Sequence, residues 1–378
     1  MYVQWEEFWW NEITGPHRLI ESVADALADN KIVVLNVPYD LPWRHTMRNA
    51  VCALVREKID NSDLFVESID AEDDVPQGME PGRYILDRFA DESVAKGYRS
   101  TAKNSIQQYI VSNNVIKDRL IWIKGLPEME VDRWLSFCRG FAIQAMASGT
   151  FVIEISKLKP AGVAKCMVFD YSDYISNYDL QLFSNIIMDA RSDYSVSWKN
   201  YAAMVVAKLC GTDAEIAERL LRTTDFKGGS VLETLKEIAD DKEYVKRGSV
   251  PDSQHVLWYS RNGGEEELRL RIWAAQVQVL FPIIELERIQ FISENLDIIA
   301  AALKNNTVMQ FNEIVTNAMD IELGTLCYMM KHWTDDGSYI LVVPDETKRH
   351  RIQFLHECRN LIAHVDCCSP KNVAELLG

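Results

Sequence analysis

The residues best suited to catalysis lie near the end of the sequence, where an arginine and an asparagine precede a histidine. Arg359 and Asn360 are followed by Leu-Ile-Ala and then by His364. A histidine transfers protons near neutral pH, and an arginine binds phosphoryl oxygens through a permanent charge and a bidentate fork. Cleavage of RNA without a metal needs both, because a ribose 2′-hydroxyl must be activated, the departing 5′-oxygen protonated and the phosphoryl charge stabilised. The motif therefore favours metal-independent phosphodiester cleavage.

The motif ends a segment that is basic against an acidic background. Residues 348–364 hold four basic side chains, one acid and three histidines, whereas the whole chain has 40 Lys and Arg against 56 Asp and Glu, a net charge of −16. Such a chain repels nucleic acid overall, so any RNA site must be a local positive patch. We predict that Lys348, Arg349, Arg351 and His356 contact RNA. The last two repeat the arginine–histidine spacing, but an isoleucine follows the arginine.

The motif resembles that of the HEPN family, helical domains with an R-x4-6-H motif in which a polar residue usually follows the arginine. Arg359, Asn360 and His364 match it with a four-residue spacer, and the resemblance covers roughly residues 268–378. It implies a metal-independent endoribonuclease in which two modules dimerise so that both motifs line one cleft. The three residues are then catalytic, RNA is the substrate, and a homodimer forms through the C-terminal helices.

Helix geometry and neighbouring charges leave alternatives open. Five residues on an ideal helix turn the chain by about 140°, so Arg359 and His364 do not share a face. This separation favours a break in the helix or assembly across a dimer. The two cations also suit the end of a helix, whose dipole they stabilise, and several HEPN-like modules only dimerise or bind RNA. Three carboxylates are candidates for orienting the histidine: Glu285, Asp320 and Glu322.

The N-terminal half alternates between short apolar runs and helical stretches. The runs, several of them rich in Val and Ile, are typical of buried strands, and the pattern predicts βαβ units with a mainly parallel sheet. The predicted strands are residues 32–37, 64–69, 120–123, 151–155 and 166–169. The predicted helices are 18–28, 44–56, 106–116, 131–147 and 180–188, and an acidic loop is expected over 70–82. We expect one α/β domain over residues 1–190.

The loop after the first predicted strand lacks what a nucleotide phosphate requires. A phosphate cradle needs glycines, whose backbone N–H groups approach the anion, together with a Lys and a Ser or Thr. Residues 36–47 contain neither glycine nor lysine, and Pro38 and Pro42 donate no N–H. The order of elements resembles a P-loop or AAA-type NTPase domain with a helical appendage, but the motifs are missing. We predict a degenerate domain that does not hydrolyse ATP, and no cofactor.

Two features near the strand ends suggest weaker alternatives. Asp170 ends an apolar strand and superficially suits magnesium, although a turn that includes Ser172 is the simpler interpretation. Arg44, His45 and Arg48 begin the next helix and are able to receive a phosphate without a glycine loop, but we favour an exposed helix start.

The rest of the chain is predicted to be helical. Residues 191–262 form a small appendage, in which 212–215 and 230–233 match the capping box. A polar, glycine-containing stretch then precedes an all-helical bundle over 263–378. Its predicted helices are 268–303, broken or kinked at Pro282, then 320–332 and 348–363.

The remaining sequence features favour an intracellular protein without a metal. The eight cysteines are scattered and lack paired metal-ligand spacings, which predicts reduced thiols in the cytoplasm and no zinc. The longest uncharged stretches are too short to cross a bilayer, and no signal peptide is expected. Trp5, Phe8 and Trp9 share one helical face, which we interpret as core packing rather than partner docking.

The predicted architecture joins a sheet domain, a helical appendage and an RNase-like bundle. That arrangement resembles bacterial defence and abortive-infection proteins, an inference from analogy alone. The competing hypothesis is a non-enzymatic subunit of a multiprotein defence assembly, in which the degenerate domain docks a true ATPase and the bundle dimerises or binds RNA.

Overall fold

The fold is described from a computed structural model of the chain. It describes residues 4–60, 62–100, 105–142, 149–156, 166–250, 254–334 and 337–378. The chain divides into two compact units: the first is Met1–Phe183 with Thr212–Ile216, and the second is Ser184–Gly211 with Ala217–Gly378. The division into three domains at residues 190 and 262 stays a prediction.

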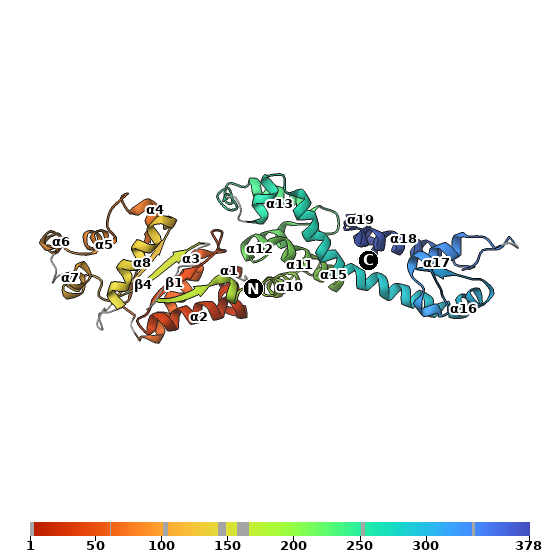
Figure 1. Ribbon diagram of the computed structural model, residues 1–378, viewed down its shortest axis with the longest axis horizontal. Coiled ribbons are helices and arrows are strands. Elements are labelled where there is room, and N and C mark those ends of the chain that lie inside the picture. Colours follow the sequence, from red (N-terminus) through yellow and green to blue (C-terminus); the bar gives the residue numbers. More distant parts are fainter. Residues whose placement is uncertain are drawn as a thin grey trace. The chain divides into compact units, whose positions relative to one another are not determined.

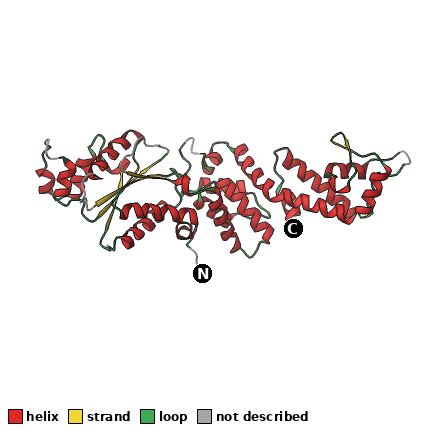
Figure 2. Cartoon of the chain, turned by 60° about the horizontal axis from the view of Figure 1, so that its bottom comes forward, coloured by secondary structure: helices red, strands yellow, loops and turns green. Residues whose placement is uncertain are grey.

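In the described residues, the first unit is built on a sheet of five parallel strands. Figures 1 and 2 show this sheet among its helices. All five predicted strands are confirmed, and their order in the sheet is β2-β3-β4-β1-β5. In the central register Val33 pairs with Val152 on one side and with Met167 on the other. The strands are β1 (Ile32–Asn36), β2 (Phe65–Asp70), β3 (Arg119–Lys124), β4 (Gly149–Ile155) and β5 (Cys166–Asp170). A wholly parallel sheet agrees with the predicted P-loop-like architecture.

Helices cover this sheet. Those of the first unit are α1 (Trp5–Glu12), α2 (Thr14–Ala28), α3 (Arg44–Lys58), α4 (Ala71–Asp74), α5 (Pro81–Phe89), α6 (Glu92–Gly97), α7 (Ile106–Ser112), α8 (Glu128–Ala142) and α9 (Tyr171–Tyr174). Helix α10 (Asn177–Asp189) begins in this unit. Trp134 and Phe137 of α8 pack with Ile121 and Ile153 of the sheet in one large core. The end of the predicted helix 131–147 lies outside the described residues.

The acidic segment of this unit differs from its prediction, whereas its N-terminal aromatic residues agree with theirs. The acidic loop over residues 70–82 is wrong in part, because α4 forms one helical turn within it and α5 begins at Pro81, where proline is favoured. The N-terminal aromatic residues pack inward, as predicted: Trp9 is fully buried, and Trp5 and Phe8 are partly buried. Its ring lies 5.2 Å from that of Phe183, which Trp5 and Phe8 also contact.

The second unit is almost entirely helical. Its elements are α11 (Val196–Cys210), α12 (Ala214–Thr223), which begins in the first unit, α13 (Val231–Asp240), α14 (Val256–Arg261), α15 (Glu265–Glu294), α16 (Leu296–Asn305), β6 (Met309–Gln310), β7 (Glu313–Ile314), η1 (Ala318–Asp320), α17 (Leu323–Lys331), α18 (Glu346–Ala363) and α19 (Pro370–Leu377). Helix α15 is its central element and packs against α11, α14, α18 and α19. None of the described helices has the length and apolarity needed to cross a membrane.

The structure corrects the long helix predicted over 268–303. Helix α15 continues through Pro282 and ends at Glu294, and Asn295 separates it from α16. Proline removes a hydrogen bond to the carbonyl four residues earlier. Both Pro282 and Gln278 are exposed, so water can satisfy that carbonyl and the helix tolerates the loss.

One of the two predicted capping boxes is wrong. The Asp213 carboxylate, rather than Thr212, accepts the N–H groups of Glu215 and Ile216, at 3.1 and 3.2 Å. In the second, the Ser230 hydroxyl accepts the N–H of Glu233 at 3.4 Å, as predicted, but among the described residues the reciprocal bond from the Ser230 N–H to the Glu233 carboxylate is absent. Asp and Thr are both favoured as N-cap residues, so the sequence alone did not show which of the two neighbours caps α12.

Candidate functional site

Helix α18 carries the arginine–histidine motif, and its sequence explains why it forms. The Asp345 carboxylate caps its first turn by accepting the N–H of Thr347 at 2.9 Å. The helix then buries Ile352, Leu355, Cys358 and Ile362, which recur at intervals of three and four residues and face the interior. His364 terminates the helix as its C-cap residue. The expected break between Arg359 and His364 is therefore absent, and the two lie on different faces of a continuous helix.

Arg359 is held by an acid from the segment before α17. Its Nη2 donates to the Glu322 Oε2 at 3.1 Å, and both side chains are partly exposed, at 33% and 41%. The Glu322 N–H donates in turn to the Gln310 Oε1 at 2.9 Å. Glu322 thus pairs with the arginine rather than orienting a histidine. The other two candidate carboxylates bond elsewhere, Glu285 with Arg288 and Asp320 with Asn317.

Asn360 bonds to a histidine one turn earlier instead of to His364. Its Nδ2 lies 3.1 Å from the Nε2 of His356, so the imidazole accepts from the amide if that nitrogen carries no proton. Burial lowers the pKa of His356, and the positive charges of Arg359 and Lys331 lower it further. The imidazole is therefore neutral at pH 7. We call Glu322, His356, Arg359 and Asn360 the α17–α18 cluster.

His364 stands apart from this cluster. Its side chain is exposed, and within the part of the chain that the structure describes the imidazole makes no hydrogen bond. Its backbone N–H closes the helix on the Asn360 carbonyl at 3.0 Å, and Val365 follows with a left-handed φ of 61°. The imidazole is free to meet a ligand, but the structure does not bring it to Arg359.

The other predicted RNA-binding residues are already engaged by protein groups. The Lys348 ammonium pairs with Glu294 at 2.6 Å, and Arg351 makes two bonds to Glu287 at 2.6 and 2.7 Å. Arg349 donates to two backbone carbonyls just before its helix. Both acids lie on α15, 54 and 64 residues earlier in the sequence. The segment that is basic in the sequence is therefore largely neutralised in the fold.

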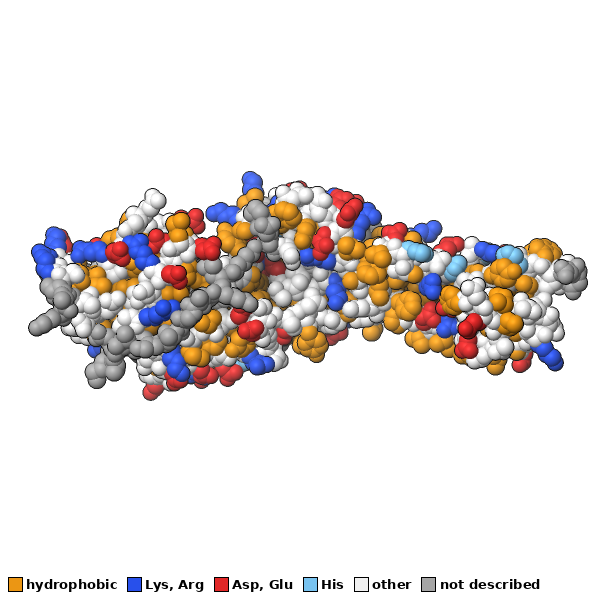
Figure 3. All heavy atoms as spheres, in the orientation of Figure 1, with side chains coloured by type: hydrophobic (Ala, Val, Ile, Leu, Met, Phe, Trp, Pro, Cys, Tyr) orange, Lys and Arg blue, Asp and Glu red, His pale blue; other side chains and the backbone are white. Residues whose placement is uncertain are grey.

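Exposed aromatic rings near α17 were missed by the sequence analysis. The rings of Tyr328 and His332 stack at 3.8 Å, and those of Trp333 and Tyr339 lie 4.3 Å apart. Tyr328 and Trp333 are 47% and 63% exposed. Figure 3 shows His side chains spread over this part of the C-terminal unit, beside exposed apolar groups. Exposed rings of this kind stack with nucleobases. The four-residue spacing of Tyr328 and His332 on a helix was the available signal.

In the first unit, carboxylates lie where a nucleotide phosphate would bind. In parallel α/β sheets that place is the carboxyl end of the strands, next to a helix N-terminus. Here Arg44, the first residue of α3, pairs with the buried Glu154 of β4. Glu154 also accepts the Trp122 indole N–H at 2.5 Å. The Trp43 N–H donates to the Glu215 Oε2 at 2.9 Å.

The remaining candidates for metal or anion chemistry are structural in the described residues. Asp170 accepts the N–H of Ser172 at 3.0 Å and the Asn36 amide at 2.7 Å, which matches the turn interpretation. Among the described residues there is no cluster of three His, Cys, Asp or Glu side chains able to hold a metal. The cysteines are all free thiols, six of them buried.

Comparisons with known proteins do not assign a family. No family model matches the chain, and no curated protein matches it in sequence. Among solved structures, the chain is similar to the Aeropyrum pernix Orc1 protein, whose structure was determined in complex with DNA. The identity is 14% and the TM-score 0.34, over 97% of this chain and 82% of the other. A likeness at that level carries no argument about function.

Proposed function

We propose that the chain is a metal-independent endoribonuclease of the HEPN type, with Arg359, Asn360 and His364 as its active site. The observation that carries this proposal is that all three lie at the accessible end of one regular helix, Arg359 in a partly exposed ion pair and His364 exposed. Exposed ion pairs contribute little stability, so an RNA phosphate can displace Glu322 from Arg359 at small cost. The resemblance to defence effectors suggests the setting in which such an enzyme acts.

Each residue has a separate task in this proposal. Arg359 binds the phosphoryl oxygens and stabilises the charge that grows on them during attack by the 2′-hydroxyl. His364 transfers the proton to or from the reacting oxygens. Asn360, now bonded to His356, donates its amide to the bound phosphate. Exposed Tyr328 and Trp333 stack with unpaired bases, which favours single-stranded RNA.

The angle between the two catalytic side chains requires a second copy of the chain. Arg359 and His364 diverge by about 140° on the helix, so one chain cannot aim both at the same phosphate. We propose a two-fold homodimer in which both motifs line one cleft. Helices α15 and α16 supply apolar residues for such a contact, because Phe281, Leu286, Ile289, Leu296 and Ile298 are each at least 38% exposed.

The neutralised basic segment favours a second candidate, a non-catalytic scaffold or RNA-binding subunit of a defence assembly. Lys348, Arg351 and Arg359 each have a carboxylate partner. Those pairs weaken any long-range attraction of RNA by a chain of net charge −16. In this case the C-terminal helices dimerise and the protein does not cleave RNA.

The test is incubation of the purified protein with total RNA in the presence of a chelator. We expect cleavage by wild type and its loss in Arg359→Ala, His364→Ala and the double variant, with the double no worse than either single, because residues acting on one transition state are not additive. His350→Ala is the matched control, since His350 is an exposed histidine of the same helix. If none of the proteins cleaves RNA, the scaffold is favoured. If the alanine variants cleave RNA at the wild-type rate, this motif is not the active site.

A further inference from the structure

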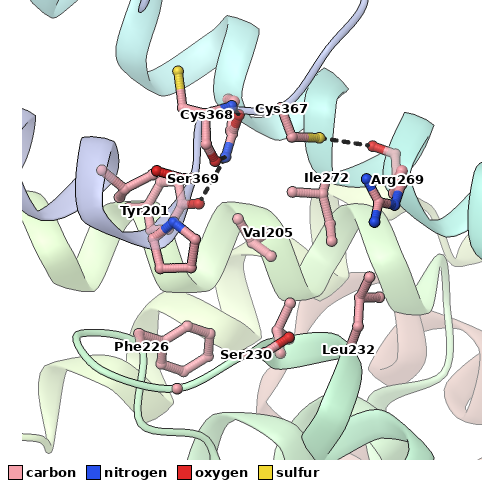
Figure 4. Close-up of a pocket in the computed structure, with 15 residues that line it drawn as sticks. Tyr201, Val205, Phe226, Ser230, Leu232, Arg269, Ile272, Cys367, Cys368 and Ser369 are labelled. Atoms are coloured by element: carbon pink, nitrogen blue, oxygen red, sulfur yellow. Dashed lines mark hydrogen bonds between the residues drawn. The ribbon is translucent and has the colours of Figure 1, made fainter.

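A cavity of about 300 Å³ lies in the second unit between α11, α13, α15 and the start of α19. None of the four residues of the α17–α18 cluster lines it, nor does His364. Figure 4 shows Val205 and Ile272 in its middle, Tyr201 and Phe226 toward one end, and Arg269 with Leu232 toward the other. Its volume is at the lower end of the range for small-molecule sites, which are typically apolar pockets with a few convergent polar groups.

The charge of the lining is opposite to that of the whole protein. Of the 15 lining residues, Arg269 is the one charged side chain, and no acid is among them. The whole chain has 16 more acids than bases. The first turn of α13, at Val231 and Leu232, also lines the cavity, and its N–H groups are favourable toward an anion. The cavity is therefore an apolar pocket whose electrostatic preference is for negative charge.

Arg269 is available to a ligand. Within the described residues its guanidinium has no ion pair or side-chain hydrogen bond, although its charge helps to lower the pKa of Glu265 and acts, together with that of Asp366, on the Cys367 thiol. Glu265 is already held by the Lys236 ammonium at 2.6 Å. Arg269 itself is exposed, which places it at the mouth of the pocket.

At the other end, Tyr201 has a proton to donate. Its side chain is almost fully buried, with 8% of the residue exposed, and its oxygen accepts the Gln276 amide at 3.1 Å. Gln276 is fixed in that orientation, because its Nε2 also donates to the Cys368 carbonyl at 3.1 Å and its Oε1 accepts the Cys368 N–H at 2.7 Å. No acceptor for the Tyr201 hydroxyl proton is found in the described part of the chain. Burial raises the pKa of Tyr201 to about 12, so the hydroxyl keeps its proton at physiological pH.

We propose that this cavity binds a small organic acid with an aromatic or branched apolar body. The anionic group meets Arg269, the body packs between Val205, Phe226 and Ile272, and a polar atom at the far end accepts from Tyr201. This site is independent of the proposed RNA cleavage, because it uses none of the residues assigned to that reaction.

The test compares two fluorescent probes that differ in one charged group. Anilinonaphthalene sulfonate has an aromatic body and a sulfonate, and N-phenylnaphthylamine is the same body without the sulfonate. We expect saturable binding of the sulfonate at one site per chain, at least tenfold tighter than the neutral probe, because a charge-assisted bond to Arg269 adds to burial of the rings. In Arg269→Gln this preference is lost.

Arg219→Gln is the control, because it removes a partly exposed arginine of α12 that does not line the cavity. Val205→Trp fills the cavity and is expected to abolish binding of both probes; if circular dichroism shows it unfolded, Arg269→Gln decides. Absence of saturable binding, equal affinities for the two probes in wild type, or an unchanged sulfonate affinity in Arg269→Gln would each overturn the proposal.

Discussion

Among single residues, the pairing of Arg44 with Glu154 places a protein carboxylate beside the start of α3. A helix N-terminus at the end of parallel strands attracts anions, and here the protein supplies a carboxylate of its own. Glu154 is 4% exposed and receives both the guanidinium and the Trp122 indole. The Arg44 guanidinium therefore has a protein carboxylate as its counter-charge.

This arrangement predicts a large loss of stability in Arg44→Ala. Breaking a fully buried pair costs about 3–5 kcal/mol because one charge stays buried alone. Arg44 is 31% exposed, so water screens part of that cost and we expect about 2–3 kcal/mol in urea unfolding. Adding Glu154→Leu should recover much of the loss. Lys96→Ala, at an exposed pair with Glu92, is the control, and an Arg44→Ala loss as small as the control's would contradict the interpretation.

The sequence could locate the candidate site but not its contacts. The spacing of Arg359, Asn360 and His364 is local, and a single helix preserves it. The partners of Lys348 and Arg351 are acids of α15, and only tertiary folding brings them close. A basic run in a sequence therefore says little about surface potential until the acids that pack against it are known.

At the scale of elements, the strands were predictable and several boundaries were not. Runs rich in Val and Ile that are buried on both faces leave a strong signal for parallel strands. The hairpin of β6 and β7 had no such signal. Phe311 and Asn312 both adopt positive φ in its turn, whereas the sequence that usually indicates a turn of this kind is Asn-Gly. Helix α19 was missed because eight residues carry little periodic signal.

The exposed apolar residues of α15 and α16 lead to a prediction about assembly. Leu286 is 66% exposed, and a two-fold contact would bury it on both chains. We expect sedimentation of wild type at micromolar concentration to show twice the monomer mass of 43.3 kDa, and Leu286→Asp to show the monomer. Leu270→Asp makes the same change at an exposed position 16 residues earlier and should leave the dimer intact. A monomeric wild type, with or without RNA, would refute the dimer.

For the chain as a whole, the structure has a parallel sheet unit in which Glu154 bonds to Arg44 and Trp122, and a helical unit with an accessible arginine–histidine motif. Composition and patterning were sufficient for the sheet and for the helical character of the rest. They could not show that α11 packs along α15 within one compact unit, because that contact joins residues far apart in the sequence. The cavity between these helices could not be predicted from the sequence for the same reason.

We propose above all that the motif at the end of α18 cleaves RNA through the ribose 2′-hydroxyl without a metal. This is tested with an end-labelled single-stranded RNA and its 2′-O-methyl counterpart, both in excess chelator. We expect wild type to cleave only the unmodified RNA and to leave 2′,3′-cyclic phosphate ends, because the 2′-hydroxyl is the nucleophile. Cleavage of the 2′-O-methyl RNA, cleavage that requires added metal, or no cleavage of either RNA would contradict it.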